Sequence, residues 1–205
     1  MKLILASRSP RRRELLGMLG LDIEIFVPDT EEDCDRSVLT PDELVMGLAC
    51  RKARAAAEQL EALGRAPEDA VILSADTVVV LDGNILEKPA DADDARRMLR
   101  ALSGRRHEVY TGIAAIHNRR LAVDVQNTGV YFRTLTDEMI DAYVASGDPM
   151  DKAGSYGIQS CGALFVERLE GDYFNVVGLP LVRTDEMLYS AFGIRLAAES
   201  GEAQT

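Results

Sequence analysis

The chain has 205 residues, of which 47% are hydrophobic, a length and composition suited to one sizeable domain or to two small lobes. Its formal net charge of −11 argues against DNA or RNA as an extended partner, although a small anion can still bind where cations are concentrated. No stretch approaches the roughly 18 apolar residues of a membrane span, and three scattered cysteines predict neither a disulfide framework nor a Cys-type zinc site. We therefore expect a cytoplasmic protein.

The beginning of the chain carries a local concentration of positive charge. Residues 3–5 are typical of a short strand, and Ser9 followed by Pro10 is typical of a helix start. Three arginines at 11–13 then occupy the first helical turn, although a helix N-terminus favours carboxylates by ~0.3–1 kcal/mol each. A bound phosphate would make this arrangement favourable. The alternative is a solvated cluster whose side chains reach acidic neighbours such as Glu14.

The next elements are a short strand at 23–27, an acidic loop at 29–33 and a long helix. A capping box at Thr40 opens this helix, which we expect to end near Leu63. Lys52 falls on its apolar stripe. Position alone favours a lysine that turns outward to solvent, and the alternative is a charge that points into a cleft.

Residues 70–89 predict a strand, an interruption, a second strand and a hairpin turn at 82–83. Asp76 stands at the interruption, where burying an ionised carboxylate costs several kcal/mol unless it is paired or binds a metal. We expect a catalytic task for it, and the alternative is a carboxylate satisfied by backbone donors where the strand bends. Lys88, which precedes a proline, is by itself typical of plain surface.

The second half of the chain alternates between helices and strands, which predicts an α/β protein with a partly mixed sheet. We expect helices at 91–102, 136–146 and 180–193, strands at 107–116, 121–135, 163–168 and 173–177, and a glycine-rich loop at 151–162. In that loop Gly154 and Gly157 would let the backbone approach a ligand, and Gln159 could hydrogen-bond a base edge. A flexible connector is the alternative.

Other chemistries lack their motifs. The sequence has no Walker A motif and no G-x-G-x-x-G after a strand. Two histidines and three cysteines give no zinc ligand set, so a metal would be a hard ion on oxygen ligands, Mg²⁺ or Mn²⁺.

Six short motifs are spread along the chain. They are residues 6–12 (ASRSPRR), 52–53 (KA), 74–79 (SADTVV), 87–89 (EKP), 102–104 (LSG) and 152–159 (KAGSYGIQ). In this order and spacing they resemble the Maf family of nucleoside triphosphate pyrophosphatases. The resemblance implies an elongated mixed β-sheet with flanking helices and two lobes around a deep nucleotide-binding cleft, as in ITPase-like proteins. It also implies a homodimer. Because no linker rich in Pro, Gly or Ser divides the chain, we expect one domain at 1–193 with a flexible tail at 194–205.

The resemblance further implies a metal-dependent hydrolase of nucleotide-pool house-cleaning, which converts a nucleoside triphosphate to the monophosphate and pyrophosphate. Asp-Thr-Val at 76–78 and Tyr-Gly-Ile-Gln at 156–159 look like the branch that acts on dTTP and UTP. The implied roles are general base for Asp76, phosphate binding for Ser9, Arg12, Lys52 and Lys88, base selection for Arg11, Thr77 and Gln159, and binding of Mg²⁺ or Mn²⁺ for Glu32 and Asp76.

Two alternatives stay open at this point. Members of the family are also linked to arrest of septum formation, so the protein could be a nucleotide-binding regulator without significant turnover. The substrate could also be a modified pyrimidine nucleotide such as pseudo-UTP or 5-methyl-UTP, because these bases share the same pairing edge.

Overall fold

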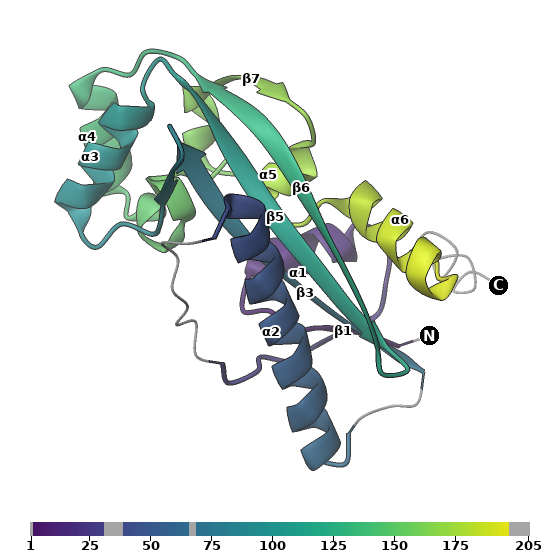
Figure 1. The fold of residues 1–205 in the computed structure, drawn as a ribbon. Helices are drawn as coiled ribbons and strands as arrows, with labels where there is room; N and C mark the ends of the chain where they lie inside the picture. Colours follow the sequence, from purple (N-terminus) through teal and green to yellow (C-terminus); the bar gives the residue numbers. More distant parts are fainter. Residues whose placement is uncertain (1, 31–38, 66–68, 197–205) are drawn as a thin grey trace. The chain divides into compact units, whose positions relative to one another are not determined.

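Strands and helices alternate through the part of the chain that the structure, a computed structural model, describes: residues 2–30, 39–65 and 69–196. The strands are β1 (Lys2–Leu5), β2 (Ile23–Ile25), β3 (Ala70–Leu81), β4 (Asn84–Leu86), β5 (Arg106–His117), β6 (Arg120–Phe132) and β7 (Val166–Glu170) (Figure 1). The α-helices are α1 (Pro10–Gly17), α2 (Pro41–Ala62), α3 (Ala92–Leu102), α4 (Asp137–Ala145), α5 (Tyr173–Val177) and α6 (Leu181–Phe192). Three short 3₁₀ helices are η1 (Asp148–Asp151), η2 (Ala153–Ser155) and η3 (Cys161–Phe165).

Within the described residues, the strands form one seven-stranded sheet in the order β2-β1-β3-β5-β6-β7, with β4 beside β3. β1 pairs in parallel with β2 and β3, whereas β4 is antiparallel to β3 and β7 is antiparallel to β6. The predicted α/β class with a mixed sheet and flanking helices is confirmed.

The chain divides into two compact units. Unit 1 comprises Met1–Asp76, Thr111–Gln126 and Gly178–Thr205, and unit 2 comprises Thr77–Tyr110 and Asn127–Val177. Each unit has a core of its own, described separately below.

The core of unit 1 is built by α2 against strands of the sheet. As predicted, the Thr40 hydroxyl accepts a hydrogen bond from the Glu43 N–H (3.3 Å), and the Glu43 carboxylate accepts one from the Thr40 N–H (2.9 Å). The helix then packs small and apolar residues on β1, β3 and β5. These contacts comprise Ile4, Ala6, Ala56, Leu60, Ala70 and Ile72 in one cluster, and Ala49, Ala53 and Ala114 in another.

The core of unit 2 is formed by α3 and α4 together with the strand segments of that unit. Its buried side chains include Val79, Leu99, Leu102, Val109, Val130, Phe132, Ile140, Tyr143, Tyr156 and Phe165. Asp91 and Thr136 cap α3 and α4 with their side chains, as the sequence predicts. Ion pairs from Arg96 to Asp141 (2.6 Å) and from Arg100 to Asp137 (2.7 Å) link the two helices.

One predicted strand is wrong, and another begins three residues later than expected. Residues 173–177 form α5 although their aromatic and β-branched side chains favour a strand, because the Asp172 carboxylate accepts the Phe174 N–H (2.8 Å) and starts a helical turn. The Asn175 amide then donates to the Val109 carbonyl and to the Thr128 hydroxyl, both at 2.9 Å. The strand expected at 163–168 begins only at Val166, after η3.

The end of the described chain packs onto α6. The predicted tail begins at 194, yet Leu196 is buried and its N–H donates to the Asp185 carboxylate (2.7 Å). The remainder of that tail lies outside the described residues. Of the helices that the structure describes, none combines the length and the apolar character of a bilayer span.

Candidate functional site

The loop between β1 and α1 is held by a buried serine and a buried arginine. The Ser7 hydroxyl accepts hydrogen bonds from the Ser9 N–H (3.1 Å) and from Arg12 Nη1 (3.3 Å). Arg12 Nε donates to the Gly178 carbonyl at 2.7 Å. The guanidinium of Arg12 is therefore fixed in place by groups of unit 1.

The three arginines of α1 differ in their surroundings. Arg12 is buried, Arg11 is half-buried and Arg13 is exposed, so the solvated-cluster interpretation is wrong for Arg12. Ser9 occupies the N-cap position as predicted, but its side chain makes no capping hydrogen bond, and the first turn has no acidic residue. This helix N-terminus thus has the polarity that favours an anion.

Lys52 and Asp76 form the central ion pair of unit 1. Lys52 Nζ lies 2.5 Å from Asp76 Oδ1, and the two side chains are only 18% and 16% exposed. The outward orientation that position alone favours for Lys52 is therefore wrong, because the lysine points at a half-buried carboxylate. The predicted interruption of the strand is also wrong, since β3 runs unbroken through Asp76.

The position of Lys52 follows from the way α2 sits on the strands. The hydroxyl of Ser74, two residues before Asp76, donates to the Ala49 carbonyl of α2 (2.7 Å). On β5, a Cβ added to Gly112 would lie 2.4 Å from the Val45 carbonyl group, so α2 passes over a point where only glycine fits.

Two predicted motifs meet at one end of the β1–β3 pair. Leu5 of β1 pairs in parallel with Leu73 of β3. Ser7 follows Leu5 by two residues, and Asp76 follows Leu73 by three. Ligand sites of α/β proteins are common at the carboxyl ends of parallel strands. Within unit 1, the buried Arg12 loop and the Lys52–Asp76 pair therefore belong to the same edge.

Unit 2 brings three further motifs together. The Gly154 N–H donates to the Glu87 carbonyl (3.0 Å), which ties the 152–159 segment to the turn that carries Lys88. A Cβ at Gly154 (φ 67°) would lie 2.9 Å from Val79 of β3, the strand that also holds Thr77. The protein's own packing therefore requires this glycine, whereas the sequence suggested the approach of a ligand.

The segment predicted as a glycine-rich loop is an ordered run of 3₁₀ turns fixed by a polar cluster. Tyr143 and Ser160 each donate a hydroxyl hydrogen bond to the Asp148 carboxylate (2.5 Å), and Lys152 Nζ lies 3.1 Å from the same group. Burial raises the pKa of Asp148, but these hydrogen bonds outweigh it and hold the pKa below its usual value. The Gly157 N–H donates to the Tyr143 hydroxyl (3.0 Å). The flexible-connector interpretation is therefore wrong.

The predicted site residues fall in both units. Unit 1 contains Ser9, Arg11, Arg12, Lys52 and Asp76, and unit 2 contains Thr77, Lys88 and Gln159. Lys88 and Gln159 are exposed and Thr77 is half-buried. Glu32 lies outside the described residues.

A model of the Maf-like protein family matches residues 2–191. The chain belongs to the Maf family. This Maf protein is 47% identical over 197 residues to the dTTP/UTP pyrophosphatase of Caldanaerobacter subterraneus subsp. tengcongensis, with 95% of this chain and 91% of that protein covered. It is also 47% identical over 182 residues to the dTTP/UTP pyrophosphatase of Bacillus cereus, with 89% and 91% covered. Among solved structures, that of the Staphylococcus aureus Ham1 protein is similar, with 14% sequence identity and a TM-score of 0.44. The match covers 64% of this chain and 72% of the Ham1 chain.

Some residues that build this Maf site were not among the predicted site residues. Ser74 and Gly112 position α2, while Tyr143 and Asp148 order the 152–159 segment. Ser74 stands inside the SADTVV motif, which is a signal that sequence reasoning could have used. The other three act through contacts with residues distant in sequence, and no local pattern marks them.

The donor set of this Maf protein fits a metal that is held partly by its substrate. The described residues contain no group of three or more His, Cys, Asp or Glu side chains that could hold an ion. Mg²⁺ in nucleotide sites is usually held by one or two carboxylates together with phosphate oxygens. Asp76 can supply such a carboxylate at the edge that also carries Arg12.

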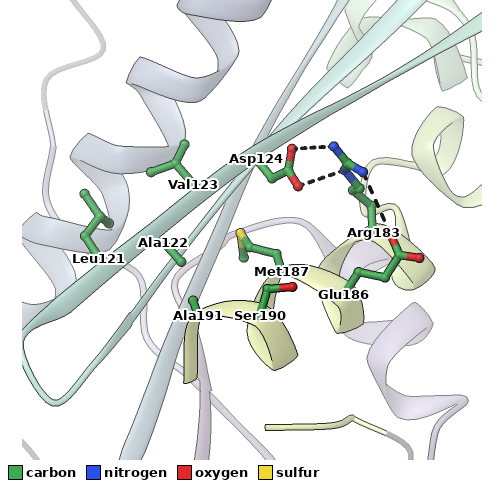
Figure 2. Close-up of a pocket in the computed structure, with 9 residues that line it drawn as sticks. All are labelled: Leu121, Ala122, Val123, Asp124, Arg183, Glu186, Met187, Ser190 and Ala191. Atoms are coloured by element: carbon green, nitrogen blue, oxygen red, sulfur yellow. Dashed lines mark hydrogen bonds and ion pairs between the residues drawn. The ribbon is translucent and has the colours of Figure 1, made fainter. Parts of the chain in front are cut away.

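A separate groove lies between β6 and α6 in unit 1 (Figure 2). Its volume is about 530 Å³, and it is lined by Leu121, Ala122, Val123, Asp124, Arg183, Glu186, Met187, Ser190 and Ala191. Arg183 is the positively charged residue that lines the groove. The Nε and Nη2 atoms of Arg183 lie 2.8 and 3.0 Å from the Asp124 carboxylate. None of the predicted site residues that the structure describes lines the groove, and its arginine is already paired, so we do not place a triphosphate there.

Proposed function

We propose that this Maf protein hydrolyses dTTP and UTP to the monophosphate and pyrophosphate, as a nucleotide-pool sanitation enzyme of the cytoplasm. The observation that carries the proposal is the Lys52–Asp76 pair at the edge where the Arg12 loop also lies. A protein that only binds a triphosphate gains nothing from a carboxylate beside its cations. A hydrolase needs one.

Asp76 would orient and deprotonate the water that attacks the α-phosphorus. Its carboxylate is held by Lys52 at 2.5 Å, which restricts its direction before any substrate arrives. Phosphoryl transfer passes through a loose transition state, so most of the catalysis comes from positioning and charge stabilisation. Arg12, Lys52 and Lys88 would supply positive charge to the phosphates, with Ser9 in the same loop as Arg12.

A divalent cation, Mg²⁺ or Mn²⁺, would be held by Asp76 and by oxygens of the triphosphate, with Glu32 as a further ligand. When bound, it would neutralise charge on the departing pyrophosphate. The protein's own cations act in the same direction, because each lowers the cost of charge on the leaving group.

Base selection would depend on Arg11, Thr77 and Gln159. The exposed amide of Gln159 can both donate and accept a hydrogen bond, as uracil and thymine require. A site that hydrogen-bonds a base edge rejects other edges more strongly than shape alone can. The homodimer implied by the family resemblance stays a prediction.

The proposal is tested by pyrophosphate release from a panel of canonical and modified triphosphates in Mg²⁺ or Mn²⁺. We expect dTTP and UTP to be hydrolysed, with kcat/KM at least about tenfold above that for GTP and ATP. Faster turnover of pseudo-UTP or 5-methyl-UTP would identify a modified pyrimidine nucleotide as the preferred substrate. Binding of nucleotide without turnover of any member would contradict the proposal and favour a regulator of septum formation.

A further inference from the structure

A buried histidine of unit 2 contacts the segment that carries Gln159. His107, in β5, is 2% exposed, and its Nε2 shares a hydrogen bond of 2.9 Å with the hydroxyl of Tyr156. The imidazole stands edge-on to Phe132 and to Tyr156, with ring centroids 4.9 and 5.4 Å apart. Tyr156 is itself buried and precedes Gln159 by three residues.

Packing alone does not account for an imidazole at this place. Among the described residues, His107 Nδ1 has no hydrogen-bond partner. A buried polar atom without a partner costs about 1–3 kcal/mol, so an apolar side chain of similar size would fill the same space at lower cost. Burial, with a smaller effect from the charge of Arg106, lowers the pKa of His107 to about 3, and the ring is neutral at ordinary pH. What the imidazole adds to the core is its bond to Tyr156.

The backbone that Tyr156 anchors is conformationally unusual. Ser155, directly before Tyr156, has a φ of 62°, in the left-handed region that costs a non-glycine residue roughly 1–3 kcal/mol. Such a conformation persists only where its surroundings hold it. Ser155 is fully buried with its hydroxyl 3.1 Å from Met98 Sδ, and Gly154 is tied to Glu87. Tyr156 anchors the side of this turn that leads to Gln159.

We propose that His107 is a positioning residue for base selection, which acts through the Tyr156 hydroxyl to fix the backbone that presents Gln159. The inference rests on the proposed function, in which Gln159 helps to select the base. His107 itself is enclosed by Phe132 and Tyr156, so it acts on the nucleotide only indirectly.

The test compares kcat and KM for dTTP and GTP in variants that remove one hydrogen-bonding group. Tyr156→Phe keeps the aromatic ring and loses the hydroxyl, and His107→Leu removes the imidazole. We expect both to raise the KM for dTTP about tenfold with little change in kcat, because contacts to the base act on ground state and transition state alike. The kcat/KM preference for dTTP over GTP should fall by the same factor.

Two matched variants separate positioning from general destabilisation. The amide of His107→Gln reaches about as far as imidazole Nε2 and should restore KM to within about threefold of wild type. Tyr131→Phe removes another hydroxyl of unit 2, which donates to Glu170 at 3.0 Å on the exposed surface, and should change neither KM nor the preference. Tyr156→Phe carries the test even where His107→Leu folds poorly.

Double variants identify the route of the effect. In a Gln159→Ala background, Tyr156→Phe should produce no further loss of preference. A lower melting temperature with unchanged KM and preference in Tyr156→Phe would overturn the inference, as would an undiminished effect in the Gln159→Ala background. If Gln159→Ala abolished the preference and Tyr156→Phe did not, the inference alone would fail. If the wild-type protein did not prefer dTTP, the proposed function would fail as well.

Discussion

Asp76→Asn is expected to lower kcat for dTTP by about 10²–10⁴-fold while the protein stays folded, because general-base catalysis typically contributes a factor of that size. Asparagine has nearly the shape of aspartate and still offers an oxygen to Lys52 Nζ, which lies 2.5 Å from the native carboxylate. It cannot accept the proton of the attacking water. Steady-state pyrophosphate release at saturating dTTP and a thermal melt of the same sample measure both parts of the prediction.

Asp82→Asn is the matched control for this substitution. Asp82 is also an aspartate next to an arginine or lysine, but it directly follows β3 and is exposed in the turn to β4. There Arg105 Nη2 lies 2.6 Å from its carboxylate. Its φ of 51° suits asparagine as well as aspartate, so we expect normal folding and normal kcat. If Asp76→Asn retained more than about a tenth of wild-type kcat, Asp76 would not be the general base.

Gly112→Ala is expected to destabilise the protein by about 3 kcal/mol or more, because overpacking against an unyielding neighbour reaches the upper end of the usual range. The added Cβ would lie 2.4 Å from the carbonyl carbon and oxygen of Val45, which are backbone atoms of α2. The helix can relieve this contact only by moving as a unit, and it carries Lys52. For a chain of this size the melting temperature should fall by roughly 6–12 °C, and kcat should fall as Lys52 is displaced from Asp76.

Gly47→Ala, in the same helix, is the matched control and is expected to raise the melting temperature instead of lowering it. Gly47 is exposed on α2, and a Cβ there would meet nothing within 4 Å. Alanine is favoured over glycine inside a helix by about 1 kcal/mol, so this variant should melt slightly above wild type. Equal tolerance of the two substitutions in thermal melts would contradict the close approach of α2 to β5.

The features that could be predicted from the sequence are mostly those determined by near neighbours in the chain. The caps at Thr40, Asp91 and Thr136 depend on residues within one turn, and all three form as expected. The helix at 173–177 starts with the local bond from the Phe174 N–H to Asp172, but it is also held by Asn175 bonds to β5 and β6, and no local pattern reveals these. The carboxylate of Asp76 inside the unbroken β3 is likewise paired with a distant residue, Lys52, which precedes it by 24 residues.

The candidate site could be predicted only as a set of residues. The motifs indicate Lys52 and Asp76 separately. The position of Lys52 on its helix predicts a side chain that faces solvent, and only tertiary packing turns it toward the Asp76 carboxylate. The sequence pattern predicts that Gly154 and Gly157 leave room for a ligand, whereas in the structure Val79 and Lys152 occupy this space. Their requirement arises from contacts between segments distant in sequence.

In the proposed reaction, water attacks the α-phosphorus of a pyrimidine triphosphate. The most direct test is hydrolysis of dTTP in water labelled with heavy oxygen, followed by mass spectrometry of the products. The proposed attack on the α-phosphorus gives dTMP and pyrophosphate, with the label in the phosphate of dTMP and none in pyrophosphate. Label in pyrophosphate, or release of dTDP and orthophosphate, would contradict it.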